Sequence, residues 1–203
     1  TLLADGDVTV NASLETGTAD TVDGDATSGL VSVTSSNGSV AMSAATVMTG
    51  DATVTGNGTA TSGAITLTAE RNVDSDALST GVASAAEGDA TSGAIDVVAT
   101  SGNVTLTTVT SGDATVAGNG TATSGAITLT ASGANGTLTL DDALTGVASV
   151  GATGSATSGA ITLLADGDVT VNASLETGTA DTVDGDATSG LVSVTSSNGS
   201  VAM

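Results

Sequence analysis

The sequence predicts an all-β protein, a β-solenoid in which three-sided coils of about 32 residues stack into a rod. In Ile127-Thr128-Leu129-Thr130-Ala131 the apolar side chains fall on every second residue, as in a β-strand with one buried face. The motif Ala-Thr-Ser-Gly that introduces this strand recurs every 30 to 34 residues, with its first residue at Ala26, Ala60, Ala90, Ala122, Ala156 and Ala187. Repetition on this scale is typical of solenoids.

Each repeat unit contains three strand-like segments, so we expect one three-sided coil per unit. The first segment is the strand just described. The second follows a short polar turn, as in Val104-Thr105-Leu106, and the third follows a glycine, as in Gly112-Asp113-Ala114-Thr115-Val116. The third segment then continues through a Gly-Asn-Gly corner into the next Ala-Thr-Ser-Gly motif. No segment has the 3.6-residue periodicity of a helix, so we expect no helices.

The core has to be built from small and aliphatic side chains, because the chain has no aromatic residue, no cysteine and no proline. We expect the apolar positions of the first segment to form two stacked columns inside the coil, with the threonines between them outside. The inward residues are Ile65, Leu67, Ile95, Val97, Ile127, Leu129, Ile161 and Leu163.

The sequence also contains a second, much longer repeat. Residues 1–42 and 162–203 are identical, so five units form one super-repeat of 161 residues. We therefore expect residues 1–203 to form a single continuous solenoid without a distinct capping unit. Because an uncapped solenoid exposes unpaired strand edges, we expect the rod to continue, either along the chain or by end-to-end stacking of subunits into filaments.

The charge excludes several functions. The net charge is −21 and Arg71 is the one basic side chain, whereas nucleic-acid binding needs many lysines and arginines. No run of 18 or more apolar residues is long enough to cross a membrane as a helix, so we expect no membrane insertion. Without histidine, cysteine, lysine or tyrosine, the chain lacks the usual bases and nucleophiles, and we do not expect an enzyme.

Aspartates recur in pairs at the predicted corners. Calcium needs several carboxylate and carbonyl oxygens that converge, and stacked corners are one way to supply them. The candidate calcium ligands are Asp5, Asp7, Asp23, Asp25, Asp166, Asp168, Asp184 and Asp186. The alternative is that these aspartates are solvated turn residues. We expect no other cofactor.

Asparagines provide a second corner signal. Eight of the nine stand in the glycosylation acceptor Asn-x-Ser/Thr, namely Asn11, Asn37, Asn57, Asn103, Asn119, Asn135, Asn172 and Asn198. Turn chemistry is the alternative, since Asn-Gly forms tight turns and threonine starts the next strand. It accounts for the five Asn-Gly sites but not for Asn11, Asn103 and Asn172.

Outward Thr-x-Thr pairs raise ice binding as a further hypothesis, because threonines on a flat β-face can order water. The outward pairs of the first segment are Ser32/Thr34, Thr66/Thr68, Asp96/Val98, Thr128/Thr130 and Thr162/Leu164. A lattice match needs an unbroken array, and Asp96/Val98 interrupts this one.

The segments Gly125–Ala131 and Ser101–Thr107 resemble the repeats of filamentous-haemagglutinin-like adhesins. This resemblance implies a secreted right-handed β-helix of a large bacterial surface protein, with a role in adhesion or surface structure and no active-site residues. We therefore expect a structural extracellular filament or surface fibre. The alternatives are an adhesin stalk that binds a host, cell or polysaccharide partner through its corners, and a calcium-stabilised surface-layer or ice-binding repeat protein.

Overall fold

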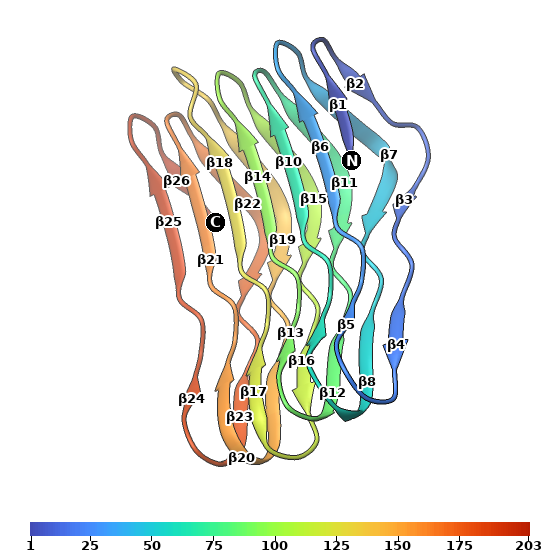
Figure 1. Ribbon diagram of the computed structural model, residues 1–203. Helices are drawn as coiled ribbons and strands as arrows, with labels where there is room; N and C mark the ends of the chain where they lie inside the picture. Colours follow the sequence, from blue (N-terminus) through green and yellow to red (C-terminus); the bar gives the residue numbers. More distant parts are fainter.

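The computed structural model describes residues 1–203, except the side chain of Ala44, and has the predicted β-solenoid fold (Figure 1). About six coils stack into a rod, and three parallel sheets run along it. The described residues form no helix. Accordingly, no helix able to cross a membrane is found among them.

Sheet A is formed by the first segment of each unit. In its alternating Ile/Val-x-Leu/Val pattern every second side chain is buried. All full-length strands of this sheet therefore end where the pattern ends. In spatial order its strands are β1 (Leu2–Ala4), β6 (Val31–Ser35), β10 (Ile65–Ala69), β14 (Ile95–Ala99), β18 (Ile127–Ala131), β21 (Ile161–Ala165) and β25 (Val192–Ser196).

Sheet B is formed by the second segment and lies behind sheet A in Figure 1. Its strands are β2 (Val8–Thr9), β7 (Val40–Met48), β11 (Val73–Ser79), β15 (Val104–Thr110), β19 (Leu138–Leu144), β22 (Val169–Glu176) and β26 (Val201–Ala202), and the short strand β3 (Leu14–Glu15) also pairs with β7.

Sheet C has eleven strands and is bent, because the chain turns back at the predicted Gly-Asn-Gly corner. Its outgoing leg continues from sheet B and contains β4 (Ala19–Thr21), β8 (Ala52–Asn57), β12 (Ala83–Glu87), β16 (Ala114–Val116) and β23 (Ala180–Asp184). Its return leg leads back to sheet A and contains β5 (Ala26–Thr27), β9 (Ala60–Thr61), β13 (Ala90–Thr91), β17 (Gly120–Thr123) and β24 (Ala187–Thr188). The long strand β20 (Ala148–Thr157) rounds the corner and joins both legs.

Each coil contributes strands to three sheets, as predicted, and these are arranged along two long sides. Sheet B and the outgoing leg form the descending side, and the return leg and sheet A form the ascending side (Figure 1). Strand register confirms one coil per unit, since Ile65 pairs with Val31 in the preceding unit and with Ile95 in the following one.

The core is divided into two apolar clusters. The larger cluster lies between sheets A and B, and all eight predicted inward residues of the first segment are fully buried in it. The smaller cluster lies between the two legs of sheet C and is made of alanine and valine alone, for example Ala85, Ala122 and Val116. A layer of polar side chains separates the two clusters, and this layer is the central feature of the molecule.

Candidate functional site

A waist of buried hydroxyl groups crosses the coil between the two apolar clusters. Ser92 stands before the glycine that precedes sheet A, and Thr80 stands before the glycine that precedes the outgoing leg. The Ser92 hydroxyl donates to the carbonyl of Gly112 across the coil at 2.6 Å and accepts the N–H of Gly125 in the next coil at 2.7 Å. Each such hydroxyl thus joins the two sides of one coil and also joins that coil to its neighbour.

The same pair of bonds repeats along the rod and forms a continuous hydroxyl spine. Thr80 donates to Gly93 at 2.8 Å and accepts from Gly112 at 2.9 Å, so the two kinds of position alternate in one chain of hydrogen bonds. The hydroxyls that make both bonds are those of Thr16, Ser28, Thr49, Ser62, Thr80, Ser92, Ser111, Ser124 and Thr145. Because a buried hydroxyl is costly without a partner, this pairing is what allows a polar layer inside the core.

Glycine is required beside the spine because neighbouring coils approach closely there. A Cβ atom on Gly112 would lie 2.0 Å from the carbonyl oxygen of Gly81, and one on Gly125 would lie 1.9 Å from that of Gly93. No real Cβ contact is so short, so both glycine columns are needed for the coils to stack. The sequence carries this signal as two Ser/Thr-Gly pairs per unit, which look like ordinary turns when each unit is considered alone.

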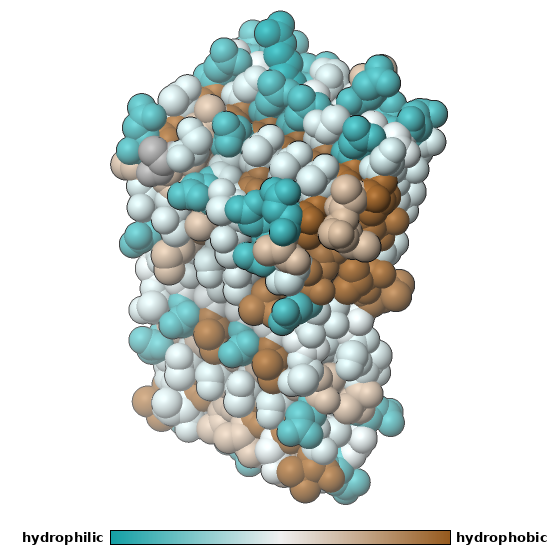
Figure 2. All heavy atoms as spheres, turned by 180° about the vertical axis from the view of Figure 1, so that it is seen from behind, coloured by the Kyte–Doolittle hydropathy of each residue, from teal (hydrophilic) through white to brown (hydrophobic). Residues whose placement is uncertain are grey.

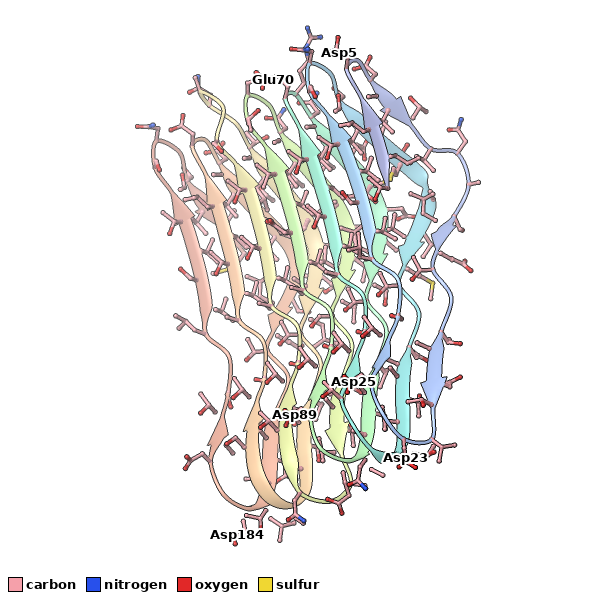
Figure 3. All side chains as sticks on the ribbon, in the orientation of Figure 1. Asp5, Asp23, Asp25, Glu70, Asp89 and Asp184 are labelled. Atoms are coloured by element: carbon pink, nitrogen blue, oxygen red, sulfur yellow. The ribbon has the colours of Figure 1, made fainter. Side chains whose placement is uncertain are left out.

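The predicted calcium aspartates lie in corners at opposite ends of the coil. Figure 3 shows Asp5 at the corner between sheets A and B, and Asp23, Asp25 and Asp184 at the corner within sheet C. The structure therefore does not bring the eight aspartates into one place. Among the described residues, no group of three or more histidine, cysteine, aspartate or glutamate side chains is arranged to hold a metal ion.

Several of these carboxylates accept backbone hydrogen bonds from the next coil. Asp7 accepts the N–H of Ser39 at 2.8 Å, and Asp25 accepts that of Thr59 at 3.0 Å. Asp168, the duplicate of Asp7, accepts the N–H of Ser200 at 2.7 Å. The corner aspartates therefore extend the backbone ladder past the strand ends, and calcium binding stays a prediction.

Asparagine side chains continue this corner ladder. In the column that starts at Asp7, Asn72 accepts the N–H of Asn103 at 2.9 Å, and Asn103 in turn accepts that of Thr137 at 2.9 Å. Asn72 is the one asparagine outside the acceptor motif, and it performs the same task as Asn103 inside it. Ladder formation thus explains an asparagine that turn chemistry does not.

All eight predicted glycosylation sites are exposed, but only some of their side-chain amide nitrogens are hydrogen-bonded. The Nδ2 atoms of Asn37, Asn172 and Asn198 donate to the carboxylates of aspartates in the preceding coil, at 2.5 to 2.8 Å. That of Asn119 makes a longer contact of 3.5 Å with Glu87. At Asn11, Asn57, Asn103 and Asn135 no such bond is found among the described residues. Glycosylation itself stays a prediction.

One corner carboxylate has a clearly shifted acidity. Glu70 accepts hydrogen bonds from the hydroxyls of Thr100 at 2.7 Å and Ser101 at 3.0 Å. These bonds, helped by the nearby positive charge of Arg71, lower the pKa of Glu70 below its ordinary value, although desolvation acts in the opposite direction. Glu70 thus stays ionised at neutral pH and ties its corner to the next coil.

A cavity lies at the end of the rod nearest residue 1. It measures about 160 Å³ and is lined mainly by aliphatic and hydroxyl side chains, among them Leu2, Leu14 and Val33. Glu15 is the one charged side chain that lines it. The cavity lies between sheets A and B, in line with the apolar core.

No known protein family, curated protein or solved structure matches this chain. The resemblance to filamentous-haemagglutinin-like adhesins therefore stays a prediction. What the residues define is a class of architecture, an acidic β-solenoid with a hydroxyl spine, and the functional proposal rests on that architecture.

Proposed function

We propose that this protein is a structural component of an extracellular filament or surface fibre, in which stacked coils set length and stiffness. The observation that carries the proposal is that every coil is joined to the next by the same set of bonds. Backbone ladders run along sheets A, B and C, and the hydroxyl spine adds a further ladder inside the core. Tension along the axis is then shared by many hydrogen bonds in parallel.

Continued stacking gives the filament its length. The duplicated segment supports this, because a coil with the sequence of residues 1–42 fits the solenoid in two different surroundings. Apolar side chains gather at the end formed by β25 and β26 (Figure 2), where Leu191, Val192, Val201 and Met203 are exposed. Such an end offers both unpaired strand edges and apolar surface to a further coil, whether it comes from the same chain or from a second copy.

Electron microscopy and light scattering of the purified chain test the proposal. We expect elongated particles whose length grows with protein concentration, and more so at high salt, since the net charge of −21 opposes association. Val201→Asp should suppress growth by placing a charge on the end surface. Leu144→Asp is the matched control: Leu144 is 42% exposed against 44% for Val201, but it lies in the middle of the rod with a strand on either side, so this variant should leave growth unchanged. Compact monomers at every concentration and salt level would contradict self-assembly.

An adhesin stalk is the second candidate, because one corner differs from the others. Between β10 and β11 lies the single basic side chain, Arg71, beside Glu70. Binding at this corner would give a ligand a local recognition point on a uniform rod. Loss of cell or polysaccharide binding on Arg71→Ala, with filament growth unchanged, would support the stalk over the plain filament.

A further inference from the structure

The outward surface of the ascending side carries aligned columns of mostly small side chains. It contains an unbroken threonine column on the return leg: Thr27, Thr61, Thr91, Thr123, Thr157 and Thr188. Next to it run a column of Ala or Leu and the two outward columns of sheet A, to which Thr66 and Thr68 belong. We call these four columns the threonine face, and none of their side chains is buried.

Register is kept along this face although the repeat length varies. The pairings of sheet A and of the return leg show no shift, for example from Thr91 to Thr123 and on to Thr157. Register shifts occur instead on the descending side, between Ser75 and Ala77 and between Leu140 and Asp142. Length variation is therefore absorbed away from the threonine face.

Charge is also distributed unevenly between the two sides. Of the 22 acidic residues, Asp96 is the one within the threonine face. Three others border it, each two residues before a threonine of the return leg: Asp25, Asp89 and Asp186. The descending side carries Asp74, Asp76 and Asp113 on neighbouring coils, and the corners carry many others. Charge is thus sparser within this face than elsewhere on a chain with a net charge of −21, which favours contact with something neutral.

The geometry points to ice as the ligand of the threonine face. Outward side chains recur about 4.8 Å apart between coils along every column, and about 6.7 Å apart along the strand between the two columns of sheet A, spacings close in scale to those of water molecules in ice. The return leg adds a single threonine column beside this two-dimensional part. Each threonine presents a hydroxyl and a methyl group, and β-branching restricts its rotamers, so the hydroxyls hold bridging waters in a regular array.

A second copy of the chain is the less suitable occupant. Two chains of charge −21 repel each other, whereas ice carries no net charge. The face also lacks the tryptophan, tyrosine and arginine side chains that dominate binding at protein interfaces.

Asp96 interrupts one outward column of sheet A, and Val98 and Leu164 interrupt the other; Asp96 is the charged one of the three. Its neighbours above and below are Thr66 and Thr128. A carboxylate orients water around its own charge and so disturbs the lattice locally. Asp96→Thr restores the column, and we expect it to increase ice binding over the natural chain.

Thermal hysteresis and partitioning into growing ice, measured on the full chain in dilute buffer, test the inference. We expect Thr123→Asp and Thr130→Asp to lose most of the activity and Asp96→Thr to gain. Thr115→Asp is the matched control, because Thr115 lies outward on the outgoing leg between Ser84 and Ser149, and it should keep full activity. Circular dichroism and melting curves establish that each variant is folded.

Two outcomes overturn the inference. In the first, neither the natural chain nor the Asp96→Thr variant changes ice growth. This includes the case in which the natural chain forms a dimer that Thr123→Asp abolishes, because the face would then bind a second copy. The other is equal loss of activity in Thr115→Asp and Thr123→Asp. Neither outcome bears on filament growth, which concerns the ends of the rod.

Discussion

Residues 1–42 and 162–203 have the same sequence but different surroundings, and the comparison separates what a coil specifies from what its neighbours supply. Strand β1 pairs on one side only, with β6, whereas its duplicate within β21 pairs on both sides, with β18 and β25. Leu2 is accordingly 39% exposed and its duplicate Leu163 is fully buried. The relation reverses further along, where Met42 is fully buried and its duplicate Met203 is 83% exposed.

Secondary structure differs between the duplicates as well. β22 runs without a break over Val169–Glu176, but the same sequence near residue 1 forms two short strands, β2 and β3. β22 pairs with β19 near both of its ends, across a register shift, whereas β2 and β3 lie at the edge of sheet B and pair only with β7. Strand formation in a solenoid thus depends on the adjacent coil as much as on the sequence of the coil itself. This agrees with the rule that contacts between neighbouring repeats supply much of the stability of a repeat protein.

The largest contrast is expected for a charge placed in the two duplicates of one core position. Leu163→Asp buries a carboxylate between sheets A and B and should cost several kcal/mol of unfolding free energy. Leu2→Asp leaves the carboxylate partly in water and should cost much less. Thermal or denaturant unfolding of the two variants measures the difference, and equal losses would mean that residues 1–4 have a further neighbour in solution.

For a change that creates a cavity, the duplicate nearer residue 1 should be the one that loses more stability. Met42→Ala removes a fully buried side chain and should destabilise by about 2–5 kcal/mol, whereas Met203→Ala should stay within about 0.5 kcal/mol. The same unfolding measurements apply. A large effect at Met203 would indicate that another coil covers it in solution.

Most of the fold was predictable from sequence because its signals are local. Alternation in Ile127–Ala131 and the glycine corners each lie within one unit, and together they predicted the strands, the sheets and the repeat. The hydroxyl spine was missed because Ser92 finds its partners in Gly112 and Gly125, which lie in other parts of the stack. Ser75 shows the same limit, since alternation places it inward between Met42 and Leu106, and its buried hydroxyl has no partner among the described residues.

The candidate sites were predictable in position but not in role. Asp7 and Asn103 lie at corners as expected, yet both accept a backbone N–H from the following coil. That role depends on stacking register, which no single repeat reveals. Glycosylation and calcium binding depend on conditions outside the chain and stay predictions.

A smaller contrast is expected at the waist. Gly178 and Gly17 are duplicates, but a Cβ on Gly178 would lie 2.0 Å from the carbonyl oxygen of Gly146, while one on Gly17 would meet nothing within 4 Å. Gly178→Ala should therefore destabilise by about 1–3 kcal/mol through overpacking. Gly17→Ala should be neutral or stabilise by up to about 1 kcal/mol, because it restricts the unfolded chain. Comparable losses in both variants, measured by thermal unfolding, would mean that a coil packs against Gly17.

The smallest effect concerns pH and the corner after sheet A. Glu70 follows β10 directly, as Asp166 follows β21. Hydrogen bonds from the hydroxyls of Thr100 and Ser101 lower the pKa of Glu70. A lowered pKa in the folded state means that the ionised form stabilises the fold above the ordinary pKa of glutamate. That contribution is lost as the pH falls through the lowered pKa. Because Glu70 is exposed, the effect should be small and should weaken with salt. Glu70→Gln removes the titrating group, so the difference in melting temperature between the natural chain and this variant should shrink as the pH falls below 4.5, the ordinary value. A difference that stays constant from neutral to acidic pH would show that the Glu70 carboxylate does not stabilise the corner through its charge.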